Sequence, residues 1–288
     1  MNAMNGFGTR LTDVFTQYGR LCVGIDPHAF LLEEWGLPVS AAGTREFGLR
    51  VIDAAAGRVG IVKPQVAFFE RFGSAGYAAL ETVLGAAREA GLLVIADVKR
   101  GDLGTSVEAY GQAWLTPGSS LEADAITVSA FQGVGSLSAP IALAQETGKG
   151  LFVLAATSNP ESIALQQAQV IDEIVGRRSV SRVIIDDVTQ FNAQYPAEPV
   201  GAIGVVLGAT LDLTAYGIDT ETPQTPALAV LAPGFGHQGA QLTDAPKIYG
   251  SLLRGTIVSE SRSVLGASPD GLAQVIARRS REVQDAIA

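Results

Sequence analysis

The chain contains a single cysteine, Cys22, among its 288 residues, so an internal disulfide is excluded. Because structural disulfides belong to oxidising compartments, this favours a reducing one. Cys22 lies in an apolar run, where a free cysteine is expected to be a buried core residue. Charged residues are also scarce, at 17% of the chain, whereas 47% of the residues are apolar. This composition argues against a disordered chain and predicts a globular protein with a large core.

A basic surface is missing as well, because the formal net charge is -9. Nucleic acids and anionic membranes bind to basic footprints, so neither is expected as a partner. An anionic ligand would have to meet local basic groups. No uninterrupted apolar run reaches the length of a membrane span. The first ten residues lack a basic stretch followed by an apolar one, so no signal peptide is expected and the protein is predicted to be cytoplasmic.

Several motifs of cofactor and nucleophile chemistry are absent too. The sequence contains no Walker loop, no dinucleotide fingerprint and no nucleophile elbow. Its two histidines, His28 and His237, have no neighbouring cysteines or carboxylates at the spacing of a metal site. No metal and no cofactor are therefore expected, and His28 is interpreted as a loop residue although it lies near Asp26.

Short apolar runs recur along the chain, each followed by polar or glycine-rich residues. Continuous runs of this kind are typical of strands that are buried on both faces, as in a parallel sheet. They cover residues 21–25, 60–62, 92–96, 125–128, 151–155, 202–207, 227–231 and 256–258.

Stretches with helical spacing lie between these runs, for example at 73–90, closed by Gly91, and at 162–178. Eight strands that alternate with helices predict an α/β fold, a (β/α)8 TIM barrel formed as a single domain by residues 1–288. A doubly wound open sheet is the alternative. The segments at 176–199 and 212–226 are long or rich in Thr and Pro, and are expected to be loop elaborations of the barrel.

Charged residues follow the first three predicted strands. Asp26 ends the first, Lys63 the second, and the third continues into Asp97, Lys99 and Asp102 within the string DVKRGD. Asp97 and Lys99 should point to the same side of the strand, because its side chains alternate. A lysine beside carboxylates stays charged and can act as a positioned acid. An Asp-x-Lys pair taken alone could also be a structural ion-pair network. Alternating charges at the ends of three successive strands instead indicate an active site at the mouth of the barrel.

The last two strands are followed by a different signal. The loop at 232–239 (APGFGHQG) is rich in glycine, and Arg262 follows the eighth strand. Barrel enzymes commonly bind phosphate with these two loops, where backbone amides and a bidentate arginine approach the anion. The sequence therefore predicts a phosphate site there, although a glycine-rich turn alone is weak evidence. The arginines at 278–281 are interpreted as the solvated face of a terminal helix.

These motifs resemble the orotidine 5'-phosphate decarboxylases, in particular the longer bacterial (type 2) branch with the signature Asp-x-Lys-Arg-Gly-Asp. The resemblance extends from Asp26 to Arg262, and its most specific parts are DVKRGDLGTS at 97–106 and the loop at 232–239. One departure is Ser261, since shorter members of the family have glycine before the arginine.

The resemblance implies a role for each matching residue. Lys63, Asp97, Lys99 and Asp102 would form the catalytic tetrad, with Asp102 contributed across the interface of a homodimer. Asp26 and Lys63 would bind the ribose, and Ser106 would reach the ligand of the other subunit. The remaining substrate-binding residues would be Ser158 at the pyrimidine amide, Gln238 and Arg262 at the phosphate, and Pro233.

The implied reaction is the cofactor-free decarboxylation of orotidine 5'-monophosphate to uridine 5'-monophosphate, with Lys99 protonating the C6 carbanion. Two alternatives stay open. A related Mg2+-dependent barrel acting on sugar phosphates also places acidic and lysine residues on its third strand. The second alternative is a barrel that binds nucleotide phosphates without catalysis. The intact set of charged residues argues against it.

Overall fold

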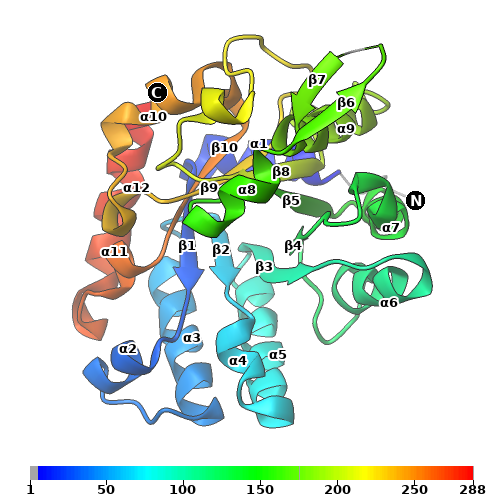
Figure 1. Cartoon of the computed structure of the whole chain (residues 1–288). Coiled ribbons are helices and arrows are strands. Elements are labelled where there is room, and N and C mark those ends of the chain that lie inside the picture. The colour runs from blue at the N-terminus through cyan, green and yellow to red at the C-terminus, as the bar shows by residue number, and fades with distance from the viewer. Residues whose placement is uncertain (1–5, 175, 288) are drawn as a thin grey trace.

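A computed structural model describes residues 6–174 and 176–287, so the start of the segment assessed for a signal peptide lies outside it. Eight parallel strands form a closed barrel in the order β1-β10-β9-β8-β5-β4-β3-β2 (Figure 1). Their bounds are β1 Leu21–Ile25, β2 Ile61–Pro64, β3 Leu93–Arg100, β4 Ala125–Val128, β5 Gly150–Ala156, β8 Ile203–Leu207, β9 Val230–Pro233 and β10 Thr256–Glu260.

The eight predicted strands are the eight strands of this barrel, so the (β/α)8 prediction is confirmed. The open sheet is excluded because β1 pairs with β10, with Leu21 opposite Val258. The strands are apolar runs because helices cover the outer face while side chains fill the interior. The largest difference is in β3, which extends past Ala96 to Arg100 and carries the DVKR residues within the barrel wall.

Helices surround the barrel, and a short hairpin is inserted between β5 and β8 (Figure 1). The helices are α1 Phe7–Tyr18, α2 Ala29–Glu34, α3 Ala41–Ala55, α4 Ala67–Glu70, α5 Gly73–Glu89, α6 Gly104–Leu115, α7 Ser138–Thr147, α8 Ile163–Gln166, α9 Val180–Asn192, α10 Ala245–Tyr249, α11 Arg262–Leu265 and α12 Leu272–Ile287. The predicted helix at 73–90 is confirmed as α5, and Gly91 follows it with a positive φ of 73°. No helix among the described residues is long and apolar enough to cross a membrane.

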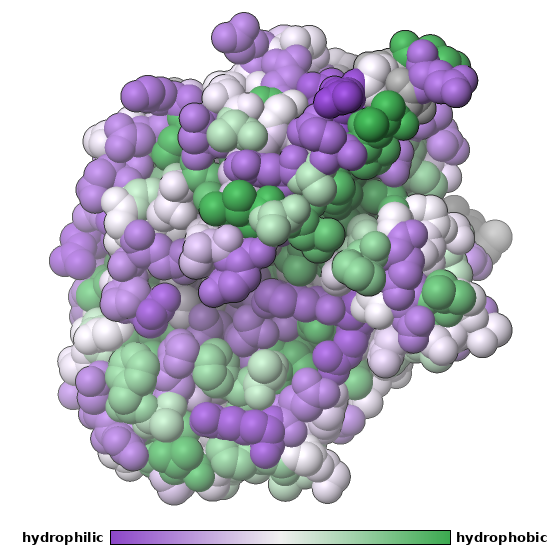
Figure 2. Space-filling view, viewed as in Figure 1, coloured by the Kyte–Doolittle hydropathy of each residue, from purple (hydrophilic) through white to green (hydrophobic). Residues whose placement is uncertain are grey.

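The predicted helix at 162–178 is wrong. The chain forms only the single turn α8 and then the antiparallel hairpin of β6 (Gln169–Asp172) and β7 (Gly176–Ser179). Apolar residues of this segment are instead exposed on α8 and on the hairpin, and Figure 2 shows hydrophobic side chains at the upper right, where the hairpin lies. Their spacing could not reveal this, since a helical pattern assumes that the apolar face is buried.

The two predicted loop elaborations differ in the structure. The segment 176–199 holds β7 and α9, so it is not a loop: Ser179 caps α9 by accepting a hydrogen bond from the Arg182 amide at 3.0 Å. Here the helix that crosses from β5 to β8 begins later than the sequence pattern suggested. The segment 212–226 contains one short 3-10 helix, Leu213–Tyr216, and is otherwise irregular.

The amino-terminal helix α1 closes the barrel at the amino ends of its strands. Its Phe7 and Leu11 are buried in a cluster with residues of the barrel interior, including Phe152 and Cys22. The Phe7 and Phe152 rings meet edge to face at 6.0 Å. A Cβ on Gly150 would lie 2.6 Å from the Phe7 ring, so this close approach requires glycine. The prediction of a buried cysteine is confirmed, because Cys22 is fully buried, and this burial raises the pKa of its thiol to about 12.

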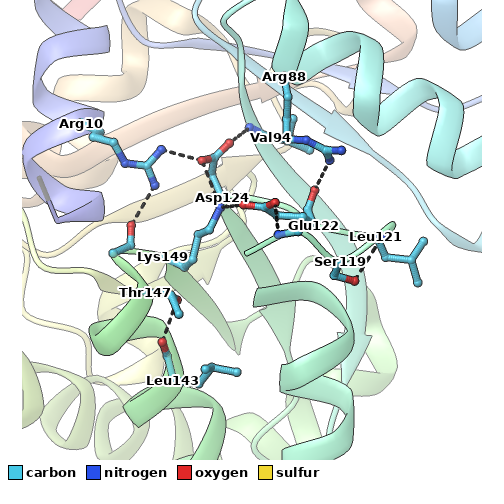
Figure 3. Close-up of polar contacts among 12 residues, drawn as sticks. Arg10, Arg88, Val94, Ser119, Leu121, Glu122, Asp124, Leu143, Thr147 and Lys149 are labelled. Atoms are coloured by element: carbon cyan, nitrogen blue, oxygen red, sulfur yellow. Dashed lines mark hydrogen bonds and ion pairs between the residues drawn. The ribbon is translucent and has the colours of Figure 1, made fainter. Parts of the chain in front are cut away.

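A network of charges secures α1 to the strands, as Figure 3 shows. Asp124 is its centre: one carboxylate oxygen is 2.5 Å from the Arg10 guanidinium, and the other accepts a hydrogen bond from the Val94 amide at 2.9 Å. Lys149 lies 3.8 Å from Asp124 and 2.7 Å from Glu122. The network lies at the amino ends of β4 and β5, so it supports the fold at the end of the barrel opposite the predicted active site.

Replacing Asp124 with alanine should destabilise the protein by about 3 kcal/mol, because the partly buried cations Arg10 and Lys149 would lose their shared partner. Urea denaturation followed by circular dichroism measures this change. As a control, Glu46→Ala breaks the exposed Glu46–Arg50 pair and should cost less than about 0.5 kcal/mol. Equal losses in the two variants would contradict a structural role for the network.

Candidate active site

Charged groups from the first three strands meet in a pocket at the carboxyl ends of the barrel strands. The pocket has a volume of about 520 Å3, and a hollow bordered by hydrophilic side chains lies near the centre of the face shown in Figure 2. Eight of the ten predicted site residues line it: Asp26, Lys63, Asp97, Lys99, Ser158, Pro233, Gln238 and Arg262. The closed barrel brings together residues that are more than 200 positions apart in sequence.

The Asp97 carboxylate is the centre of the charged array. Its Oδ2 lies 2.9 Å from the Lys63 ammonium and accepts a hydrogen bond from the Gln65 amide at 2.8 Å. Its Oδ1 lies 2.6 Å from the Lys99 ammonium and accepts a hydrogen bond from the Thr127 hydroxyl at 2.8 Å. Two cations and two neutral donors therefore fix both oxygens of one buried carboxylate.

The three charges differ in their access to solvent. The side chains of Lys63 and Asp97 are each 9% exposed, whereas that of Lys99 is 45% exposed. Burial alone would raise the pKa of Asp97, but the charges of Lys63 and Lys99 outweigh it and hold that pKa well below its usual range. Burial alone would lower the pKa of Lys63, but the charges of Asp97 and Asp26 outweigh it and raise that pKa. Lys63 and Asp97 thus form a buried pair, and Lys99 is the more exposed of the two lysines that contact Asp97.

The string DVKRGD is shaped by close backbone contacts. Lys99 has a positive φ of 49°, so Asp97 and Lys99 meet through an irregular backbone and not through simple alternation along a strand. A Cβ on Gly101 would lie 2.2 Å from the Ser129 carbonyl oxygen, which is the reason for glycine at this position. Arg100 points away from the array and pairs with Glu70 at 2.9 Å.

Two predicted site residues do not line the pocket. Asp102 lies in the loop after β3, where it accepts a hydrogen bond from the Leu103 amide at 2.9 Å. Ser106 lies in the first turn of α6 and is exposed. The structure of one chain therefore does not bring Asp102 and Ser106 together with the other eight residues.

The opposite wall of the pocket carries the predicted phosphate residues. Arg262 begins α11 directly after β10 and has no acidic partner within 4 Å in the described part of the chain. Gln238 lies in the 3-10 helix Gly236–Gln238, and its side-chain oxygen accepts a long hydrogen bond of 3.4 Å from Ser158. Gly234 has a φ of 121°, a conformation that favours glycine. Arg262 is therefore a cation of the pocket that is available to pair with an anion.

The predicted solvated face of the terminal helix is wrong for one of its arginines. Arg279 of α12 pairs with both oxygens of Glu260, whose side chain is completely buried at the end of β10. Glu260 also accepts a hydrogen bond from Ser263 at 2.7 Å. The cause is the tertiary packing of α12 against the barrel, which brings Arg279 to the buried carboxylate of Glu260. Glu260 is two residues before Arg262, so this ion pair stabilises the chain just before α11.

Two buried polar atoms in the pocket have no hydrogen-bond partner among the described residues. They are the Oδ1 atom of Asp26 and the Oγ atom of Ser261. An unpaired buried polar atom is costly, so both atoms are suited to bind a polar ligand. His28 and His237 also line the pocket, and burial is the main cause that lowers the pKa of His28.

Two residues that donate to the central carboxylate, Gln65 and Thr127, were not predicted from the sequence. Each left a weak signal. Gln65 is two positions after Lys63, and Thr127 is a polar residue inside the apolar run 125–128. Neither signal identifies Asp97 as the partner, because Asp97 is on β3, whereas Thr127 is on β4 and Gln65 follows β2. No cluster of three or more His, Cys, Asp or Glu residues suited to a metal was found within the described ranges.

The fold and the site define a (β/α)8-barrel enzyme with its charged groups at the carboxyl ends of the strands. The family model described as "Orotidine 5'-phosphate decarboxylase / HUMPS family" matches residues 19–274. The chain belongs to this family.

Individual relatives agree with the family match. The orotidine 5'-phosphate decarboxylase of Salinispora tropica is 47% identical over 270 residues, which cover 94% of this chain and 93% of the relative. That of Streptomyces coelicolor is 47% identical over 268 residues, covering 93% and 92%. A crystal structure from Streptomyces avermitilis, provisionally assigned to the same enzyme, is 42% identical with a TM-score of 0.90 and coverage of 99% and 97%. The Leishmania donovani OMP decarboxylase is 26% identical, with a TM-score of 0.74 and coverage of 98% of both chains.

Replacing Lys63 with methionine should produce a pH-dependent loss of stability. The folded-state pKa of Asp97 lies below its usual value, so its stabilisation is present above about pH 4 and is lost as the pH falls through the folded-state value. Without Lys63 the pKa of buried Asp97 rises, because Lys99 is then the one cation paired with it among the described residues, and protonation relieves the charge on Oδ2 that has lost its partner. The variant should be about 3 kcal/mol less stable near pH 7. This difference in unfolding free energy between wild type and variant should decrease by at least about 1 kcal/mol as the pH falls towards 4.

Urea denaturation at several pH values measures the gap between wild type and variant. Arg50→Met is the control, since Arg50 pairs with Glu46 on the surface and its removal should give a small difference. A gap for Lys63→Met that widens on acidification would contradict the assigned pKa directions.

Proposed function

We propose that this chain decarboxylates orotidine 5'-monophosphate to uridine 5'-monophosphate in pyrimidine biosynthesis, without a metal or an organic cofactor. The observation that carries the proposal is the arrangement of Lys63, Asp97 and Lys99 on one wall of the pocket, with an unpaired Arg262 on the other. Membership of the family supports the same reaction, because the relatives carry the name of this enzyme.

The residues of the pocket suit the parts of this nucleotide. Arg262 and Gln238 would hold the phosphate, and the Ser261 hydroxyl, which has no partner among the described residues, would donate to it. Asp26 and Lys63 would bind the ribose hydroxyls, which would satisfy the buried Oδ1 atom of Asp26. Ser158 would bind the pyrimidine amide, beside Gln238. Pro233 would line the pocket between the ring and the phosphate.

The charged array can supply the chemistry. The substrate carboxylate would lie against Asp97 and next to Lys99. The bond between C6 and the carboxylate carbon breaks, carbon dioxide leaves, and the electron pair remains on C6. The Lys99 ammonium then gives its proton to C6 and regains one from solvent. Lys99 is already held 2.6 Å from Asp97, so its charge needs little reorganisation as the carbanion develops.

Asp102 and Ser106 fit the proposal only in an assembly of two chains. Both residues lie outside the pocket of their own chain, in the loop after β3 and the start of α6. Exposed Leu103 and Tyr110 lie beside them, as suits a surface covered by another copy. We propose a homodimer in which Asp102 and Ser106 complete the site of the partner. A cytoplasmic location is part of the same proposal, since pyrimidine biosynthesis would take place there.

Purified wild-type protein should convert orotidine 5'-monophosphate in the presence of excess EDTA, and Lys99→Ala should lower kcat by at least about 10³-fold. Loss of substrate absorbance measures turnover, and circular dichroism checks the fold. Binding of uridine 5'-monophosphate to the variant should remain within about tenfold of wild type, because the phosphate wall is unchanged.

The control is Arg100→Ala, which changes the neighbouring cation that points away from the pocket to Glu70. Its turnover should stay close to that of wild type. Loss of wild-type activity in EDTA would favour a Mg2+-dependent barrel acting on sugar phosphates. Full activity of Lys99→Ala would remove Lys99 from the mechanism.

Mixing two inactive variants should restore activity if the site is shared between chains. A hybrid dimer of Lys99→Ala with Asp102→Ala has one site with both residues intact and one with neither. Random exchange of an equal mixture should therefore recover about a quarter of wild-type activity. Turnover is measured after dissociation and reassociation, with each variant alone as a control. An exchanged mixture that stays inactive would show that Asp102 serves its own chain.

A further inference from the structure

Lys99 has an unusual backbone for a residue with a side chain. Its φ of 49° is the one positive φ at a non-glycine position in the part of the chain that the structure describes. For an L-residue this conformation costs free energy, and it persists only where the surroundings enforce it. Some contact must therefore hold the Lys99 backbone.

The pairing of β3 with β4 shows where this contact must lie. Ala96 is opposite Ile126 and Arg100 is opposite Val128, so the register shifts between these pairs. Asp97, Val98 and Lys99 on β3 thus have a single residue opposite them on β4. That residue is Thr127. One residue on β4 cannot form regular backbone hydrogen bonds with three residues on β3. The β3 chain therefore bulges where Asp97 and Lys99 lie.

The Thr127 side chain replaces the missing ladder bond. Its hydroxyl oxygen accepts a hydrogen bond from the Lys99 amide at 3.0 Å, and the same hydroxyl donates to Oδ1 of Asp97 at 2.8 Å. The Lys99 ammonium donates a hydrogen bond to the same Oδ1 atom of Asp97 at 2.6 Å. These three contacts close a ring from the Lys99 backbone through Thr127 and Asp97 to the Lys99 side chain. Thr127 is 1% exposed, so water does not compete for its hydroxyl.

We propose that Thr127 is a positioning residue for the decarboxylation: its hydroxyl fixes the bulged backbone of Lys99 and thereby aims the ammonium group at the reacting carbon. The inference rests on the proposed function for its kinetic consequence, but not for its structural one. Thr127 acts through Lys99 and Asp97, and its single proton is already used in the bond to Asp97.

The side-chain chemistry explains why threonine suits this position. A hydroxyl can accept from an amide and donate to a carboxylate at once, which no aliphatic side chain can do. Its branched Cβ restricts rotation, so the hydroxyl stays between its partners. Valine keeps the shape and loses both hydrogen bonds, whereas serine keeps the hydroxyl and loses the branch. This pair of substitutions separates the role of the hydroxyl from that of packing.

Thr127→Val should lower kcat for orotidine 5'-monophosphate by about 100-fold, because misplacing a catalytic group by about 1 Å has an effect of that size. KM should change by less than about threefold, since the groups that bind phosphate and ribose are retained. Thr127→Ser should recover kcat to within about tenfold of wild type. Steady-state kinetics measures this split and the rescue.

Thr256→Val is the matched control. Thr256 is also a fully buried strand threonine, but its hydroxyl donates to the Leu252 carbonyl oxygen at 3.0 Å, at the opposite end of the barrel. The Thr256→Val variant should be less stable than wild type but should keep the wild-type kcat. Should Thr127→Val fail to fold, Thr127→Ala takes its place, because it removes the same hydroxyl with less bulk and should lose kcat to the same degree.

Crystal structures of the same variants test the inference without reference to turnover. In Thr127→Val, Lys99 should leave its positive φ and its ammonium should move away from Oδ1 of Asp97, whereas Thr127→Ser should keep both features. An unchanged Lys99 in Thr127→Val, or a wild-type kcat in that variant, would overturn the inference. If the wild-type protein fails to turn over orotidine 5'-monophosphate, the proposed function fails, and the crystal structures alone decide the role of Thr127.

Discussion

The pairing of the buried Asp97 carboxylate with two lysines is the interaction on which the rest of the site depends. A carboxylate that is 9% exposed can stay ionised only if cations and donors surround it. Lys63 satisfies one oxygen and is itself kept charged by the pair, while Lys99 satisfies the other and still faces the pocket. The array is therefore formed before any ligand arrives, as electrostatic catalysis requires.

This charged end of the barrel can exist because the other end supplies stability. Helix α1 fills the opening at the amino ends of the strands with Phe7 and Leu11. Asp124 joins Arg10 of this helix to the strands (Figure 3). The interior between these ends is apolar, so the Lys63–Asp97 pair borders a buried apolar cluster, where its electrostatic interactions are strong. Among the described residues, Lys99 is the one non-glycine residue with a positive φ, and the Thr127 hydroxyl holds its backbone.

Much of the fold and most of the pocket could be predicted from the sequence. The eight strands were recognised because each is a continuous apolar run, which is what burial on both faces demands. Eight of the ten predicted residues line one pocket, since the carboxyl ends of parallel strands meet at one mouth. The region 162–178 was assigned wrongly because its apolar residues are exposed, so that their spacing reflects no buried face. Arg279 was assigned to solvent because charge patterns cannot reveal a buried partner such as Glu260.

The sequence by itself determined the class of fold, the end of the barrel that carries the chemistry, and the residue types available there. These follow from local patterns, namely apolar runs and the polar residues after them. The tertiary structure alone decided which atoms meet: Gln65 and Thr127 on Asp97, Arg279 on Glu260, and Asp102 and Ser106 outside the pocket of their own chain. The physical reason is that hydrogen bonds and ion pairs act over about 3 Å between strands and helices that are remote in sequence. Their register and packing are fixed only when the barrel closes.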